Sequence, residues 1–138
     1  MKVVIDTNIF LDVAFKREKL FDASYKIFQC VEKGQIEAYI TENSFTDIYY
    51  LIRKQIKDTD KVYEYLGYLL DLVGVIPITE LDILESYELK AEDFEDSLVY
   101  IACKNYGCDM ILTRNVKDFK IYPIEVNTPE MLIKKLDK

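Results

Sequence analysis

The residues in this sequence that could carry chemistry are mainly carboxylates, and the first of them ends an apolar run. Asp6 directly follows the apolar run 3–5 and precedes a polar Thr-Asn pair. The chain contains no histidine, which excludes Ser-His-Asp and Cys-His catalysis, histidine-ligated zinc and imidazole acid–base chemistry. Any reaction must therefore use carboxylates, hydroxyls, amides, lysines or a metal ion.

Each candidate carboxylate, taken alone, also has an ordinary structural explanation. Asp6 could cap a helix, and Asp96 lies in the acidic run 92–96, where acids of a first helical turn meet the helix dipole. Asp118 could be a turn or cap residue. On a helical wheel Asp47 falls well away from the apolar stripe of its helix, which predicts an ordinary solvated position. Position alone therefore does not separate a functional role from a structural one.

Short apolar strands alternate with helical patterns along the chain. Strands are expected at 3–5, 36–40, 75–78, 110–112 and 124–126. Apolar residues at helical spacing predict helices over 20–31, 45–56 and 62–74, around 81–89, over 93–107 and after 128–129. Gly34 and Gly107 supply C-terminal stops, and Pro129 suits a first helical turn.

This alternation predicts an α/β protein with three layers, α/β/α, and a mostly parallel central sheet of about five strands. In such sheets, binding sites form beyond the carboxyl ends of the strands. The residues to inspect first are therefore those that follow the first and the fourth strand, namely Asp6, Thr7, Asn8, Thr113, Arg114, Asn115 and Asp118.

Length and composition indicate a single domain over residues 1–138. Half of the residues are apolar, enough for one core, and no low-complexity run or repeat occurs. The apolar run near the N-terminus breaks too soon for a signal peptide or a membrane span, so we expect a cytoplasmic protein. The cysteines have no zinc-type spacing, and we expect reduced core residues. The net charge of −7 opposes broad attraction to nucleic acid, so any RNA contact must be local.

Four motifs appear in order along the chain: Val3-Val-Ile-Asp6-Thr-Asn8, Thr41-Glu-Asn-Ser-Phe-Thr-Asp47, Phe94-Glu-Asp96-Ser, and Ile111-Leu-Thr113-Arg-Asn115-Val-Lys-Asp118-Phe. Together they resemble the PIN domain family, over nearly the whole chain, and look closest to its small stand-alone prokaryotic members. Any single motif is weak because short patterns recur by chance. As an ordered set, the four are specific.

The resemblance implies a metal-dependent endoribonuclease. The implied ligands of Mg²⁺ or Mn²⁺ are Asp6, Asp47, Asp96 and Asp118, supported by Asn8, Thr113 and Asn115. Crowded carboxylates repel one another and recruit a cation, and oxygen-only ligands suit magnesium or manganese. The ion would lower the pKa of a bound water for attack on an RNA phosphodiester, which in this family leaves a 5′-phosphate and a 3′-hydroxyl.

Two positions depart from the family pattern. Many members carry Glu where this chain has Asp47, so the carboxylate here is shorter by one methylene. Many members also carry Asp at the place of Asn115, so one negative charge is missing and Asp118 must serve. We expect both changes to weaken metal binding.

The resemblance also implies partners. Small stand-alone members often act as toxins of toxin–antitoxin pairs, form homodimers and are inhibited by a short antitoxin protein. The cations expected to contact RNA phosphates beside the acidic site are Arg53, Lys54, Lys57, Arg114 and Lys117.

Two other functions fit parts of the sequence. An inactive module with a PIN-like fold would bind or scaffold without efficient catalysis, since fold does not fix function. An aspartyl-nucleophile phosphatase also begins with Asp after a first strand. Its pattern needs a second Asp two residues later, where this chain has Asn8, so we rank it below the other two.

Overall fold

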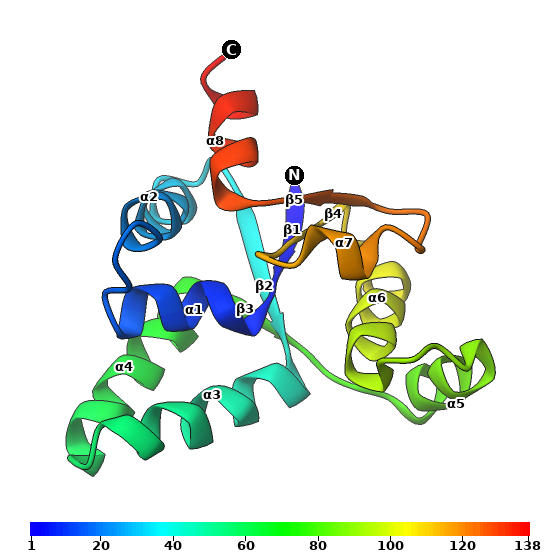
Figure 1. Cartoon of the computed structure of the whole chain (residues 1–138), viewed down its shortest axis with the longest axis horizontal. Helices are drawn as coiled ribbons and strands as arrows, with labels where there is room; N and C mark the ends of the chain where they lie inside the picture. The colour runs from blue at the N-terminus through cyan, green and yellow to red at the C-terminus, as the bar shows by residue number, and fades with distance from the viewer.

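A parallel sheet of five strands forms the centre of the molecule (Figure 1). The computed structural model describes residues 1–138. The strands are β1 (Lys2–Ile5), β2 (Glu37–Thr41), β3 (Gly74–Ile76), β4 (Met110–Leu112) and β5 (Glu125–Asn127), in the order β3-β2-β1-β4-β5. Every neighbouring pair is parallel, so each connection crosses over the sheet. The predicted α/β/α fold is confirmed.

Eight helices accompany the sheet: α1 (Thr7–Ala14), α2 (Phe21–Glu32), α3 (Glu42–Gln55), α4 (Thr59–Leu72), α5 (Glu80–Leu89), α6 (Phe94–Tyr106), α7 (Val116–Phe119) and α8 (Pro129–Leu136). None of them is both long and apolar enough to cross a membrane. The short α7 has no counterpart among the predicted helices, because four residues are too few to show a helical period.

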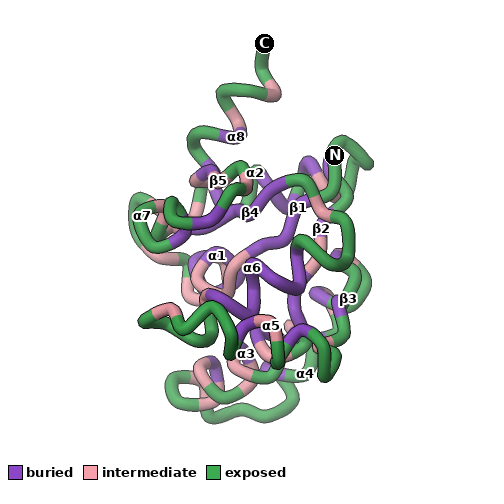
Figure 2. The backbone as a smooth tube through the Cα atoms, turned by 90° about the vertical axis from the view of Figure 1, so that its right-hand side faces the viewer, coloured by how far each residue is buried: buried purple, intermediate pink, exposed green.

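The central strand β1 sends its side chains into two separate cores. Val3 and Ile5 pack with residues of α1, α2, α3, α4 and α8 on one face of the sheet. Val4 packs with residues of α6 and α7 on the other face. Figure 2 shows the buried residues concentrated along the central strands and α6. Burial on both faces explains why β1 is apolar from Val3 to Ile5, without alternation.

The predicted helix stops and starts take the expected forms. Gly34 and Gly107 follow α2 and α6 with φ of 78° and 87°, the left-handed conformation that glycine adopts without a Cβ clash. Thr128 caps α8 by accepting a hydrogen bond from the backbone N–H of Met131 at 3.1 Å. Pro129 occupies the first turn of that helix.

The helix α5 exposes the apolar side chains that its sequence pattern predicts to be buried. The spacing of Leu81, Leu84 and Leu89 predicts a helix, and the helix is present, but these side chains are 60, 51 and 45% exposed. The residues of α5 that are buried are Asp82 and Ser86. Figure 1 shows α5 standing away from the sheet beside α6.

Polar contacts hold α5 in this position. The Asp82 carboxylate accepts hydrogen bonds from the Thr79 N–H at 2.9 Å and from Asn105 Nδ2 of α6 at 2.8 Å. Thr79 Oγ1 in turn accepts from the Asp82 N–H at 3.1 Å, which completes a capping box. Burial acts to raise the pKa of the Asp82 carboxyl, but the hydrogen bonds together lower it. An apolar pattern gives no sign of an attachment made by hydrogen bonds.

Candidate functional site

Asp6 stands where β1 ends and α1 begins. Its backbone N–H donates to the carbonyl oxygen of Leu112 in β4 at 2.9 Å, which continues the strand pairing. Its Oδ1 accepts a hydrogen bond from the Thr7 N–H at 2.8 Å, and its Oδ2 accepts one from Thr113 Oγ1 at 2.8 Å. The carboxylate therefore caps α1 and is held in one orientation through both oxygens.

Two further aspartates stand at the start of α6. Asp93 caps the helix, because its Oδ1 accepts from the Asp96 N–H at 3.0 Å. The Ser97 hydroxyl donates to the Asp93 carbonyl oxygen at 2.9 Å, which fixes the same turn. Asp96 is half-buried in the first helical turn. The acidic start of α6 is thus both a helix cap and one wall of the candidate site.

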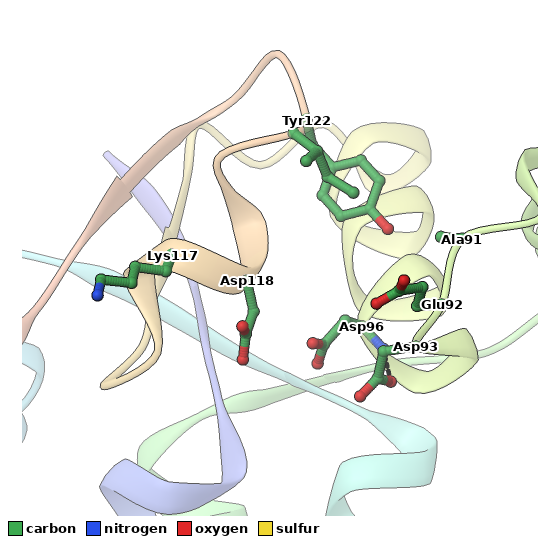
Figure 3. Close-up of a pocket in the computed structure, with 8 residues that line it drawn as sticks. Ala91, Glu92, Asp93, Asp96, Lys117, Asp118 and Tyr122 are labelled. Carbon is green, nitrogen blue, oxygen red and sulfur yellow. Dashed lines mark hydrogen bonds between the residues drawn. The ribbon is translucent and has the colours of Figure 1, made fainter.

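A cavity of about 570 Å³ lies between the start of α6 and α7. Figure 3 shows Asp93 and Asp96 on one side of this space and Asp118 of α7 on the other. The lining residues are Ala91, Glu92, Asp93, Asp96, Lys117, Asp118, Ile121 and Tyr122. Its volume falls in the range of about 300–1,000 Å³ that ligand sites occupy in proteins.

The carboxylates of this cavity repel one another. Burial raises the pKa of Asp96 to about 7, with further contributions from Asp93, Asp6, Asp118 and Glu95. Burial also raises the pKa of Asp6, although its hydrogen bonds from Thr113 and Thr7 act in the opposite direction and Asp93 and Asp118 add to the rise. Asp96 and Asp6 therefore each favour a bound proton or a nearby cation.

The donor set fits a hard, partly hydrated divalent cation. All of its side-chain donors are carboxylate oxygens, the ligands that Mg²⁺ and Mn²⁺ prefer. The structure contains no group of three or more Asp, Glu, Cys or His side chains that are close enough together to hold a metal ion. Because Mg²⁺ keeps several waters and commonly binds through one or two carboxylates, an open acidic cluster with raised pKa values suits it.

The sequence as a whole matches one known family. A family model of the PIN domain matches residues 2–117. The chain belongs to the PIN domain family. It is similar to "Ribonuclease VapC1" of Aquifex aeolicus (strain VF5), with 26% identity over 134 residues that make up 94% of this chain and 91% of the relative.

Solved structures share the fold of this PIN domain. VapBC2 from Rickettsia felis, bound to a DNA fragment from its promoter, matches with a TM-score of 0.73 and 19% identity over 92% of this chain and 98% of that chain. VapC20 of Mycobacterium tuberculosis, a sarcin-ricin loop cleaving toxin, matches with a TM-score of 0.63 and 8% identity over 79% of this chain and 86% of that chain. At these identities the likeness concerns the fold.

Asp47 lies on α3, at one side of the acidic site of this PIN domain. It is half-buried, not fully solvated as the helical wheel predicts. Burial raises the pKa of Glu95, and Asp47 is the foremost charge that adds to this rise, ahead of Asp93 and Asp6. Asp47 therefore lies close enough to Glu95, at the start of α6, to act on its carboxyl group. Glu95 and Asp93 were missed among the predicted site residues, because both lie in an acidic run that a helix start already explains.

The predicted supporting residues take different positions. Thr113 Oγ1 donates to Asp6 and also accepts a hydrogen bond from the Asn115 N–H at 3.0 Å. It is Asn115's backbone, not its side-chain amide, that makes this contact. Asn8 lies in the first turn of α1, half-buried, two residues after Asp6. The Thr113 hydroxyl thus links the first aspartate to the loop that leads to Asp118.

The predicted RNA-contacting cations also separate into two groups. Lys117 lines the acidic cavity, and Lys54 is exposed on α3. Arg53 Nη1 donates to the carbonyl oxygens of Ile56 and Lys57 at 3.3 and 3.0 Å, which closes the end of α3.

The structure gives Arg114 internal partners in addition to its predicted role at the RNA. Its side chain is only 15% exposed, and its guanidinium is bonded to internal acceptors. Arg114 therefore has a structural partner set that competes with a phosphate contact, which its position in a strand-end loop did not indicate.

Proposed function

We propose that this PIN domain is a metal-dependent endoribonuclease. Mg²⁺ or Mn²⁺ would be held by Asp6, Asp96 and Asp118, with Asp47 completing the acidic set. The observation that carries the proposal is that carboxylates from the start of α6 and from α7 line one cavity. Burial, together with repulsion from Asp93, from Asp6 at the end of β1 and from Asp118, raises the pKa of Asp96 there to about 7. RNA as substrate is supported by the similarity to a protein named a ribonuclease over 94% of the chain.

The residues of the chain would prepare the site in a definite way. A bound divalent ion supplies a water of lowered pKa and stabilises charge on phosphate oxygens. Thr7 and Thr113 hold both oxygens of Asp6, so this carboxylate keeps its direction. Asp96 carries a proton at neutral pH in part of the molecules, because its pKa is about 7. Cation binding would release that proton, so affinity for the cation increases as pH rises.

Contact with the RNA chain would come from the rim of the cavity. Lys117 lines the cavity next to Asp118, and Figure 3 shows its ammonium pointing away from the carboxylates. We propose that it contacts an RNA phosphate at the rim of the cavity. Lys54 and Arg53 lie on α3, the helix of Asp47, and we keep them as weaker candidates. The net charge of −7 means that binding depends on such local contacts.

We further propose that the protein is the toxin of a toxin–antitoxin pair, a homodimer inhibited in the cytoplasm by a small antitoxin protein. The shared fold with VapC20, a sarcin-ricin loop cleaving toxin, supports this. We expect a small upstream open reading frame that overlaps this gene. Its product is expected to bind and inhibit the purified protein. If the product of such a reading frame neither binds nor inhibits the protein, the toxin assignment is rejected.

A second candidate is a catalytically inactive PIN module that binds a partner. The absence of three acidic side chains close enough together to hold a metal ion favours it, as do the shorter side chain of Asp47 and the neutral Asn115. The two functions differ in whether RNA is cut.

The deciding experiment is cleavage of structured and single-stranded RNA in Mg²⁺ or Mn²⁺. Wild type is compared with Asp6→Asn, Asp96→Asn and a matched control, Asp71→Asn, which alters an exposed acid of α4 outside the cluster. We expect cleavage by wild type and Asp71→Asn, no cleavage by the two site variants, and inhibition by EDTA. Equal cleavage by all four proteins would indicate a contaminating nuclease, and no cleavage by any would favour the binding module.

A further inference from the structure

We propose that Arg114 is a positioning residue that sets the metal affinity of the acidic site. It lies between Thr113, which holds Asp6, and Asn115, which precedes α7 and Asp118. Its guanidinium would fix this loop against α1. The inference rests on the proposed function, since it concerns how the same carboxylates are held.

The guanidinium of Arg114 connects three helices to the loop. Its Nε donates to Asp12 Oδ2 of α1 at 2.9 Å. Its Nη1 donates to Glu130 Oε2 of α8 at 2.8 Å. Its Nη2 donates to Ser24 Oγ of α2 at 2.9 Å and to the Leu20 carbonyl oxygen at 3.1 Å. A planar fork with several donors can make these contacts at once, which a lysine cannot.

Asp12 is the buried acceptor at the centre of these contacts. Its side chain is 0% exposed, and besides Arg114 it accepts hydrogen bonds from Ser24 Oγ at 2.9 Å and from Arg17 Nη1 at 3.3 Å. A buried carboxylate is tolerated only when it is paired and hydrogen-bonded. Arg114 therefore has little freedom to leave this position.

The loop is consequently attached to α1 at two places. Thr113 bonds to Asp6 at the start of α1, and Arg114 bonds to Asp12 in its last turn. Asp6 caps the helix that also carries Asp12, so a shift of the loop along α1 would break both contacts. These two attachment points fix the start of the loop that leads to Asp118, and Phe119 of α7 fixes its far end in the second core.

Arg17 provides a natural control. It pairs with the same Asp12, at 3.3 Å, but its side chain is 36% exposed and its side-chain hydrogen bond goes to that carboxylate. Removing Arg17 therefore weakens the charge balance of Asp12 without touching the loop between Thr113 and Asp118. A difference in metal affinity between the Arg114 and Arg17 variants therefore separates the effect of positioning the loop from the effect of balancing the charge of Asp12.

The test measures Mn²⁺ affinity by electron paramagnetic resonance, with thermal unfolding of each metal-free protein. The proteins are wild type, Arg114→Met, Arg114→Lys and Arg17→Met. We expect Arg114→Met to bind Mn²⁺ about 10-fold or more weakly, the effect typical of residues that orient ligands, and Arg17→Met to bind within about twofold of wild type. Arg114→Lys keeps the charge beside Asp12, so it should recover much of the thermal stability but not the Mn²⁺ affinity.

Three results would overturn the proposal: wild-type affinity in Arg114→Met, equal loss of affinity in the two methionine variants, or recovery of affinity in Arg114→Lys in step with its stability. A wild-type protein that binds no Mn²⁺ would also reject it. A wild-type protein that binds Mn²⁺ but leaves RNA intact would reject the ribonuclease assignment while this comparison of affinities stands. In the RNA assay we expect a lower kcat with an unchanged KM for Arg114→Met, since the guanidinium of Arg114 is engaged by internal acceptors.

Discussion

Replacement of Asp96 by Asn is expected to stabilise the metal-free protein while abolishing its activity. Asp96 lies among Asp93, Asp6, Asp118 and Glu95, and burial together with their repulsion raises its pKa from an ordinary 3.8 to about 7. An amide of nearly the same shape removes one of the repelling charges. The variant therefore separates the stability of the fold from the function of the site.

The size of the effect follows from the pKa. A tenfold change in a protonation constant corresponds to about 1.4 kcal/mol, so a rise from 3.8 to about 7 corresponds to roughly 4 kcal/mol for a fully buried group. Because Asp96 is partly exposed and water screens its neighbours, we reduce this to about 1–2 kcal/mol. Loss of a negative charge from the first turn of α6 removes up to about 0.5 kcal/mol. The net gain of about 1 kcal/mol corresponds to a Tm increase of about 3–4 °C.

The gain must depend on pH in one direction. Between about pH 4 and pH 7 the folded protein retains the Asp96 proton that the unfolded chain has lost, so the stability of wild type falls as pH rises through this window. The Asn variant lacks this titration. The stability of the Asn variant relative to wild type therefore shows no gain near pH 3.8, the unfolded pKa. The gain grows until the pH reaches the folded pKa of about 7 and stays constant at higher pH.

Thermal unfolding followed by circular dichroism, in EDTA and across this pH range, measures the difference. The control is Asp71→Asn, an exposed acid that should show no such trend. A difference between wild type and Asp96→Asn that is independent of pH, or that favours wild type above about pH 7, would refute the reasoning about repulsion in the cavity.

Two further predictions concern the fold. Gly107→Ala is expected to lower the free energy of unfolding by about 1 kcal/mol, because the φ of 87° at this position is left-handed, although no atom lies near the added methyl group. Denaturant unfolding measures this loss. An unchanged midpoint would mean that the turn relaxes freely. Leu84→Ala in α5 is expected to change stability by less than about 0.5 kcal/mol, whereas Leu69→Ala in α4 is expected to lower it by about 2–5 kcal/mol, since Leu84 is 51% and Leu69 0% exposed. Equal losses in the two leucine variants would mean that the apolar face of α5 is covered in solution.

The sequence allows the sheet and most helices to be predicted because their signals are local. Runs such as 3–5 and 110–112 are apolar on both faces, and Gly34 and Gly107 end helices by their own conformation. The ordered motifs also bring Asp6, Asp96 and Asp118 into consideration. These predictions depend on neighbours in the chain, which a sequence displays directly.

The remaining features depend on partners that are distant in the sequence. The side of α5 that faces the protein is set by a hydrogen bond between Asp82 and Asn105. The role of Arg114 depends on Asp12, which looks like an ordinary surface acid of a short helix until the loop is folded against it. Asp93 combines a cap and a cavity wall, and the first of these roles conceals the second.

The position of α5 also determines how the acidic cavity moves. No residue of α5 belongs to either core of the sheet, so detachment of this helix leaves both cores packed and breaks mainly hydrogen bonds. Such an element opens as a separate unit, at a lower free energy than the whole domain. The wall formed by Ala91 and Glu92 directly follows this unit, whereas the wall formed by α7 is anchored in a core through Phe119. The cavity therefore has two walls anchored in the same core, through α6 and α7, and a rim at Ala91 and Glu92 that is joined to the less stable helix.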